Sequence, residues 1–402
     1  MSTKVPKGWA KIDLRREVEF FSGCPFDSES FNQEQGYPLI RIRDLLNHKT
    51  ETLFEGKFLD KYVIHKGDVL VGMDGDFNIV RWKGNQGLLN QRILRIRSKN
   101  EDVLDTTFFY YYIEPFLKKI NARTGQTTVK HLSIYDFYPL ELYRPKIEAQ
   151  RRIAAILQNV DNAIDKTKEL IEKYRKMKQG LMQDLLDKRK SILGADGKPI
   201  EKWELTTLGN LVTRHDAGVY KKADFYGSGR NIVGVSDLYY NESIDGQIFR
   251  LVRLSPEEID SYTLKEGDLI YGESSLVLEG IARTLYVTPR GEGTAFAWHT
   301  RRIRVNRKKV DPQFLHYLLN HETVRRQIMS VATQTALTGI TTADFFNIKL
   351  SLPDLPQQIY IRDRVKSIID MIQAEQSYID KFIKMKAGLM QDLLTGKVRV
   401  AA

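Results

Sequence analysis

The chain has 402 residues and a formal charge of +11, with 62 Lys and Arg against 51 Asp and Glu. A single core stops growing at about 250 to 300 residues, so two or more domains are expected. The positive excess indicates a polyanionic partner, with nucleic acid the first candidate, but says nothing about sequence specificity. The single cysteine, Cys24, excludes an intrachain disulfide and a cysteine-based zinc site, which favours a reducing, cytoplasmic location. Because neither a signal peptide nor an apolar run of about 18 residues is present, no membrane partner is expected.

The first globular segment, residues 1–145, is expected to be mixed α/β. Short β-branched and aromatic runs between Gly and Asn turns predict strands, for example at Tyr37–Ile42, Asp68–Val71 and Ile93–Ile96. A helix is predicted at Thr107–Ile120. Strands and helix together predict one compact unit.

Polar, aromatic and basic residues gather on the expected loops of this segment. Arg suits guanine, Asn or Gln suits adenine, and Lys suits phosphate, so these are the residue types that read DNA. Taken singly, each is also open to the alternative interpretation of a solvated surface group. The candidate DNA-binding residues of this segment are Asp74, Gly75, Asn78, Arg81, Trp82, Lys83, Asn90, Gln91, Arg92, Arg123, Thr124, Gln126 and Lys130.

A long helix without internal proline follows, within the spacer segment 146–190. Its apolar positions alternate in steps of four and three, which is the 3.5-residue period of a coiled coil. The alternative is that the helix lies on its own globular segment, and the period does not fix a partner or a direction. The seam comprises Ile153, Leu157, Val160, Ile164, Thr167, Ile171, Tyr174, Lys178, Leu181 and Leu185. A Gly- and Pro-containing linker, 191–199, ends this part of the chain.

The second globular segment, 200–354, carries the same kinds of signal. A strand is predicted at Ile303–Val305, and a helix at Pro312–Ser330 with Asp311 as its N-cap and Pro312 in its first turn. Its candidate DNA-binding residues are Lys221, Lys222, Ser274, Ser275, His299, Arg301, Gln334 and Thr335.

A second long helix occupies 355–396, with Thr395-Gly396 as a helix end, and a short tail, 397–402, follows. It repeats the coiled-coil period, and its two polar interruptions match those of the first helix, Glu375 with Thr167 and Lys386 with Lys178. The second seam comprises Ile361, Val365, Ile368, Ile372, Glu375, Ile379, Phe382, Lys386, Leu389 and Leu393.

The two halves of the chain are diverged copies of each other. The sequence Lys176–Leu186 returns as Lys384–Leu394, and Met177 lies 208 residues before Met385. Other pairs keep this offset without a gap. Upstream the match continues with small insertions, as expected when loops vary and a core is kept. The equivalent pairs include Pro145 with Pro353, Gln150 with Gln358, Trp9 with Trp203, Lys66–Leu70 with Glu266–Ile270, and Asp136-Phe137 with Asp344-Phe345.

The sequence contains no recognisable catalytic signature. The Walker phosphate-binding motif is absent, and the segment nearest to an amino-methyltransferase motif, Asp311–Phe314, has a single proline and opens a helix. The carboxylates and the seven histidines are scattered, without metal-ligand spacing. We therefore expect no catalytic residue, no metal site and no cofactor in this chain.

Each of the two variable globular segments is followed by a helix that opens with Pro-x-x-x-x-Gln and closes with Lys-Met-Lys-x-Gly-Leu-Met-Gln-Asp-Leu-Leu. This layout resembles the DNA specificity subunit of type I restriction-modification systems. The final Leu393–Val400 strengthens the resemblance, which covers the whole chain. It implies two target recognition domains separated by two long antiparallel helices. It also implies that the apolar seam residues form a spacer on which modification subunits dock.

The resemblance further implies partners that do the chemistry. Two modification subunits would supply S-adenosylmethionine and methyl transfer, and two restriction subunits would add Mg- and ATP-dependent translocation and cleavage. A helix of about 40 residues is about 60 Å long, enough to hold two reading heads about one DNA turn or slightly more apart. The predicted target is double-stranded, asymmetric and split into two half-sites. The alternatives are a non-catalytic adapter that binds DNA without sequence preference and, third, an independent nuclease or methyltransferase.

Overall fold

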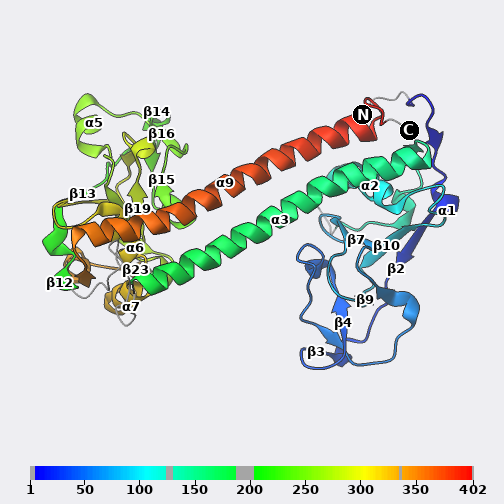
Figure 1. The fold of residues 1–402 in the computed structure, drawn as a ribbon, viewed down its shortest axis with the longest axis horizontal. Helices are drawn as coiled ribbons and strands as arrows, with labels where there is room; N and C mark the ends of the chain where they lie inside the picture. Colours follow the sequence, from blue (N-terminus) through cyan, green and yellow to red (C-terminus); the bar gives the residue numbers. More distant parts are fainter. Residues whose placement is uncertain (1–4, 124–129, 187–202, 335–336, 401–402) are drawn as a thin grey trace. The chain divides into compact units, whose positions relative to one another are not determined.

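The computed structural model describes residues 5–123, 130–186, 203–334 and 337–400, apart from the side chain of Leu185. The chain divides into two compact units (Figure 1). The first unit comprises Met1–Glu169 and Gln376–Ala402, and the second unit comprises Leu170–Glu375. Each unit therefore combines one globular segment with part of both long helices. The expected linker, 191–199, lies outside the described residues.

A four-stranded antiparallel sheet, in the order β2-β10-β7-β8, forms the centre of the first unit. Helix α2 packs on it through Phe108 and Ile113, which share a core with Val71 and Leu94. The first unit also contains a second sheet, of five strands, in the order β3-β5-β4-β9-β6. The elements of the first globular segment are β1 (Ala10–Lys11), α1 (Leu14–Glu17), β2 (Val18–Ser22), β3 (Phe31–Asn32), β4 (Tyr37–Ile40), β5 (Leu53–Phe54), β6 (Val63–Ile64), β7 (Val69–Gly72), β8 (Ile79–Arg81), β9 (Gly87–Leu89), β10 (Ile93–Ser98), α2 (Thr106–Arg123) and β11 (Tyr143–Arg144).

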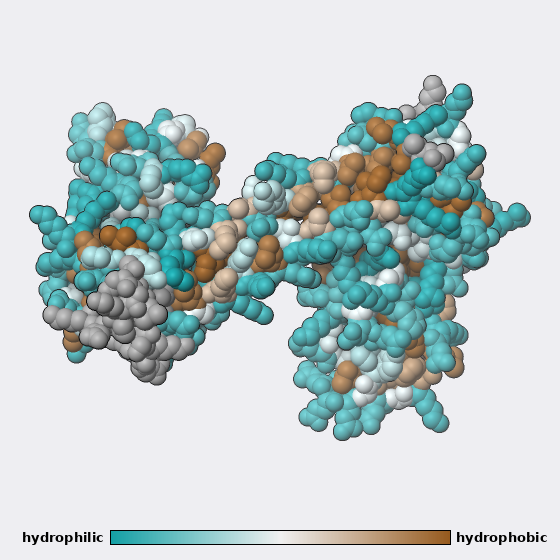
Figure 2. Space-filling view, in the orientation of Figure 1, coloured by the Kyte–Doolittle hydropathy of each residue, from teal (hydrophilic) through white to brown (hydrophobic). Residues whose placement is uncertain are grey.

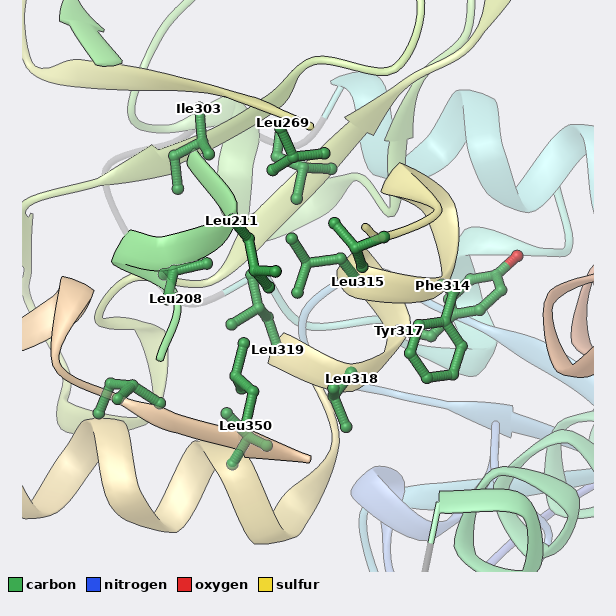
Figure 3. Packing of buried hydrophobic residues seen from close by; sticks show 14 of the residues in the cluster. Leu208, Leu211, Leu269, Ile303, Phe314, Leu315, Tyr317, Leu318, Leu319 and Leu350 are labelled. Carbon is green, nitrogen blue, oxygen red and sulfur yellow. The ribbon is translucent and has the colours of Figure 1, made fainter. Parts of the chain in front are cut away.

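The second unit repeats this plan around the sheet β13-β21-β17-β19-β15. Its core brings Leu269 and Ile303 of the sheet against Phe314 and Leu315 of α6 (Figure 3). Its elements are β12 (Glu204–Thr207), β13 (Val212–Ala217), β14 (Tyr226–Val233), α4 (Asp237–Tyr240), β15 (Ser243–Ile244), β16 (Arg250–Val252), α5 (Pro256–Tyr262), β17 (Leu269–Gly272), β18 (Ser274–Ser275), β19 (Thr284–Val287), β20 (Ala295–Phe296), β21 (Thr300–Val305), α6 (Pro312–Leu319), α7 (Glu322–Val331), β22 (Thr333–Gln334), β23 (Thr338–Gly339), α8 (Thr342–Phe346) and β24 (Lys349–Leu352).

Two partly buried ion pairs show that the repeat extends to individual contacts. Arg97 of β10 lies 2.6 Å from the Asp68 carboxylate. Arg304 of β21 lies 2.7 Å from Asp268 at the same place in the second sheet. Both aspartates belong to the Gly-Asp pair that the sequence repeat aligns, so the duplication is one of three-dimensional structure as well as of sequence.

The two long helices are α3 (Ile147–Leu186) and α9 (Leu355–Leu394), close to their predicted bounds. In the first unit the start of α3, at Leu157, shares a core with the end of α9, at Leu393. In the second unit the end of α3, at Leu186, shares a core with the start of α9, at Ile361. The helices are therefore antiparallel. Their first turns also pack into the globular core of their own unit, so the alternative of a helix lying on its own segment holds for these turns.

The predicted helix Pro312–Ser330 is wrong, because it is two helices, α6 and α7. Asn320 ends α6, and its side-chain amide donates to the Thr284 backbone oxygen at 3.1 Å. His321 then opens α7 in an extended conformation. The predicted strand Tyr37–Ile42 is also shorter, since β4 ends at Ile40.

Candidate nucleic-acid interface

Three predicted loops of the first unit converge where strand β7 ends. The Asp74 carboxylate lies 2.7 Å from His131 Nδ1 and 3.6 Å from Arg92 Nε. The backbone N–H of Gly75 donates to the Lys130 oxygen at 3.1 Å. The loops 73–76, 90–92 and 130–131 thus form one surface.

The same surface recurs in the second unit, built from strands. Ser274 pairs with Gly339 and Ser275 with Thr338, while Gln334 pairs with Thr338 from the other side. Strand β18 therefore lies beside the hairpin β22–β23. These contacts occupy the position that Asp74 and His131 hold in the first unit, where they form an isolated bridge.

Two pairs of polar side chains lie beneath this second surface. Arg301 lies 2.6 Å from Glu273, and the hydrogen bond to this carboxylate raises the pKa of the guanidinium. His215 Nε2 lies 3.0 Å from the Tyr271 hydroxyl, and burial lowers the pKa of the imidazole. Burial likewise raises the pKa of Tyr271. Both rings are therefore neutral at physiological pH and can exchange hydrogen bonds.

Three candidate residues are buried and are withdrawn from the interface. Trp82 is 2% exposed, and its indole N–H donates to the Asn85 oxygen at 2.8 Å. The Ser275 hydroxyl accepts from Tyr239 at 2.8 Å and is 3% exposed. Asn90 is also buried. These side chains support the loops from inside.

Several candidate cations already have protein partners. Lys83 pairs with Asp165 of α3, and Lys221 lies 2.7 Å from Glu258. The Lys130 ammonium donates to the oxygen of Asn121 at 2.9 Å, near the end of α2. These three lysines fix the scaffold of the loops.

The remaining candidates differ in exposure. Asn78 and Arg81 are half-buried, and the Asn78 oxygen accepts from the Gly72 backbone N–H at 3.0 Å. Thr124, Gln126 and Thr335 lie outside the described residues. The exposed ones among the remaining candidates are Gly75, Gln91, Arg92, Arg123, Lys222, His299 and Gln334, and of these Arg92 also lies 3.6 Å from Asp74.

An exposed aromatic pair stands beside Lys221 and His299 in the second unit and is not among the predicted DNA-binding residues. Tyr220 and Trp298 are 68% and 49% exposed, and their rings meet edge to face with centroids 6.3 Å apart. The backbone bridge between Val219 and Ala297 brings them together. A parallel bridge, Cys24 with Asn90, stands at this place in the first unit, so aligning the repeats would have pointed to Trp298.

The seam residues of the long helices point into the protein. Within α3, Ile153, Leu157, Val160, Ile164 and Ile171 are buried, and Tyr174 and Leu181 are half-buried. The Leu185 side chain lies outside the described residues. Within α9 the buried seam residues are Ile361, Val365, Ile368, Ile379 and Leu393, and the half-buried ones are Ile372, Phe382 and Leu389.

Other apolar side chains of these helices face outward. Tyr378, Ile383 and Met385 of α9 are 51%, 52% and 45% exposed, and Met177 of α3 is 45% exposed. Figure 2 shows apolar surface over the C-terminal part of α9. Exposed apolar patches of this kind mark protein–protein contact sites. The outward side chains, rather than the seam, are the ones available to a partner.

The two lysines that interrupt the seams make ion pairs. Lys386 lies 2.7 Å from Asp161 of α3 in the first unit. Lys178 lies 2.7 Å from Glu242, in the loop after α4 of the second unit. The equivalent lysines thus bind different elements of the chain. In each case a carboxylate neutralises the charge that the lysine brings into the seam.

Among residues 5–123, 130–186, 203–334 and 337–400, no group of three His, Cys, Asp or Glu side chains is placed to hold a metal ion. Over the same part of the chain, every helix is too short or too polar to cross a bilayer.

Comparison with known proteins agrees with this geometry. The family model described as "Type I restriction modification DNA specificity domain" matches residues 6–173 and again residues 200–382. The chain belongs to this specificity family.

Curated members of the family align over almost the whole chain. The specificity subunit of the type I restriction enzyme EcoBI of Escherichia coli is 26% identical over 97% of this chain and 85% of its own length. That of MjaVIII of Methanocaldococcus jannaschii is 25% identical over 99% of this chain and 94% of its own. Both specificity domains of the chain are thus present in these relatives.

A solved structure shows the same fold. The S subunit of a type I restriction-modification system from M. genitalium superposes with a TM-score of 0.64 at 14% identity, covering 97% of this chain and 99% of its own. At this identity the likeness concerns the fold alone.

Proposed function

We propose that this chain is the specificity subunit of a type I restriction-modification complex and reads a split, asymmetric DNA target. Membership of the specificity family supports this function. The observation that carries the split target is that the same loop surface stands at the end of β7 and of β17, with Asp74 and His131 in one copy and Ser274 and Gly339 in the other. Equivalent frames with different side chains suit two half-sites that differ in sequence.

The exposed polar and basic side chains of these surfaces supply the readout. Arg92 and Arg123 suit guanine, Gln91 and Gln334 suit adenine, and Lys222 suits phosphate. In this proposal Asn78, Arg81 and Gly75 shape the loops of the first specificity domain. The domains are those of the sequence analysis, with heads at 1–145 and 200–354 and spacer helices at 146–190 and 355–396.

Partner subunits carry the chemistry in this proposal. Two modification subunits dock on the helices, through outward apolar residues such as Ile383 and Met385, and supply S-adenosylmethionine and methyl transfer. Restriction subunits add ATP- and Mg-dependent translocation and cleavage. The complex acts in the cytoplasm, where the chromosome is accessible.

Methylome sequencing tests this function. Cells that carry the modification subunit are compared with and without this chain, and a single split motif is expected to appear only with it. Replacing residues 200–354 with the equivalent segment of another family member should change one half-site and leave the other. Methylation that lacks a motif, or salt-dependent DNA binding with equal affinity for all sequences, would instead identify an adapter without specificity.

A further inference from the structure

A small basic sheet in the second unit lies outside the loops that read DNA. Strand β14 pairs with β16 on one side and with β20 on the other. Arg230 of β14 and Arg250 and Arg253 at the ends of β16 are all exposed. Within the described residues, none of the three has a carboxylate within ion-pair distance, so their charge faces solvent unpaired.

Aromatic rings and backbone oxygens hold these cations in place. The Arg250 guanidinium carbon lies 3.8 Å from the centroid of the Tyr226 ring, and that of Arg253 lies 5.7 Å from Phe225. The Arg253 guanidinium also donates to the Asp224 oxygen. A guanidinium that is stacked in this way loses less conformational freedom on binding than a free one.

A glycine-containing bulge lies on the same sheet. Tyr226 and Arg230 both face Val252, so the three residues between them, Gly227, Ser228 and Gly229, stand out of register with β16. All three are exposed. Gly229 has φ +101°, and a Cβ there would lie 2.4 Å from the Val252 oxygen, so only glycine fits. Successive backbone N–H groups in exposed turns can bind anions, so an exposed bulge next to the arginines suits a phosphate.

The first unit provides an internal comparison. Strand β4 pairs with β5 and β9 in the same arrangement, and Gly36 takes the place of Gly229, with φ +116° and a Cβ distance of 2.4 Å to the Phe54 oxygen. The register places Tyr37 where Arg230 stands. The three arginines are therefore a property of one copy rather than of the fold. The equivalents of Arg230, Arg250 and Arg253 are Tyr37, Thr52 and Glu55.

We propose that a basic sheet of the second unit binds phosphates of the DNA backbone, and that the first unit has no equivalent phosphate-binding site. The basic sheet is defined as Arg230, Arg250 and Arg253 around the Gly227–Gly229 bulge. The inference rests on the proposed function. Phosphate contacts position a protein on the duplex without reading its sequence. The second unit thus contributes more of the salt-dependent affinity than the first.

The test measures binding of a duplex carrying the mapped target to the chain assembled with modification subunits, at a series of salt concentrations. The triple variant Arg230→Gln, Arg250→Gln and Arg253→Gln should reduce the magnitude of the slope of log affinity against log salt by about 2 to 3, since each phosphate contact contributes about 0.9. The ratio of target to non-target affinity should stay unchanged. The Arg→Lys triple variant should keep most of the slope.

A matched control removes the same charge from the first unit, through Lys49→Gln, Lys57→Gln and Lys61→Gln, three exposed residues beside β5 and β6. This variant should keep the wild-type slope. An equal fall of the slope in both triple variants would show an effect of net charge alone and would overturn the proposed role of the basic sheet. An unchanged slope in the arginine variant would overturn it as well. A wild-type complex that prefers no sequence would overturn the proposed function instead. Thermal melts check that each variant is folded.

Discussion

Gln150 and Gln358 occupy the same place in two copies of one hydrogen-bond network. The Gln150 side chain accepts from the Asp105 backbone N–H at 2.9 Å and donates to the Val103 and Pro145 oxygens at 3.0 and 2.9 Å. Gln358 accepts from the Asp311 N–H at 2.9 Å and donates to the oxygens of Lys309 and Pro353 at 3.3 and 2.9 Å. Both glutamines are fully buried, so each one joins a long helix rigidly to its globular segment.

Replacing Gln358 with Ala should destabilise the second unit. The substitution leaves the Asp311 N–H and two backbone oxygens without a partner in the interior, and each such group costs about 1–3 kcal/mol. Thermal and urea unfolding measure the loss. The control is Gln376→Ala on the same helix, an exposed residue that should change stability by no more than about 0.5 kcal/mol. Equal stability of the two variants would contradict the network.

Lengthening the spacer should change the gap between half-sites and neither half-site itself. A seven-residue heptad inserted into both α3 and α9 keeps the seam in register and adds about 10 Å of helix. Methylome sequencing should then show the original half-sites about three base pairs further apart. Altered half-sites with the original gap would refute the role of the helices as a spacer.

Trp82 and Arg92 should respond in opposite ways, because one is buried and the other has a side chain that is 56% exposed. Trp82→Ala should cost the first unit about 3–5 kcal/mol by opening a cavity. Arg92→Gln should leave unfolding almost unchanged and weaken DNA binding by about 1–3 kcal/mol at one position of the first half-site. The measurements are thermal melts and titration with duplexes substituted at each base. A Trp82→Ala variant that is as stable as wild type but no longer binds DNA would show instead that Trp82 contacts DNA.

His316 should make the second unit sensitive to acid. It is buried against Thr284 and Asn320, and burial lowers its pKa to about 4. Above pH 6.5 the imidazole is neutral in both states and has no effect. As the pH falls from 6.5 to 4 the unfolded chain takes up the proton first, so stability falls, by up to about 3 kcal/mol.

The comparison for this prediction is between two Gln variants. His316→Gln removes the titration and should flatten the stability of the second unit across pH 6.5 to 4 relative to wild type. His299→Gln, at an exposed histidine, should follow the wild-type curve. Parallel curves for wild type and His316→Gln would show that this histidine is not the acid-sensitive group.

The architecture could be predicted from the sequence because its signals are periodic or duplicated. The seams gave the bounds of α3 and α9 closely, and the Gly-Asp pairs aligned the sheets. Individual contacts could not be predicted, because a polar residue on a loop has the same sequence signal whether it faces solvent or the interior. Trp82 and Ser275 turned inward, and the division of Pro312–Ser330 depends on a hydrogen bond from Asn320 to a distant strand. The basic sheet was missed because Arg230 lies twenty residues before Arg250 in the sequence and is brought beside it only by the pairing of β14 with β16.

The first unit is assembled from both ends of the chain, with Leu389, Leu393 and Leu394 of α9 in the same core as Trp9 and Leu157. At Gly396, which has φ +67°, a Cβ would lie 2.7 Å from the Pro6 side chain, so the segment after α9 packs closely on the segment before Trp9. A ribosome therefore completes the second unit, a continuous segment, before it has made the last turns that close the first. Most of the first unit is thus synthesised before the second, yet its hydrophobic core is complete only after synthesis has passed the second unit and reached the end of α9.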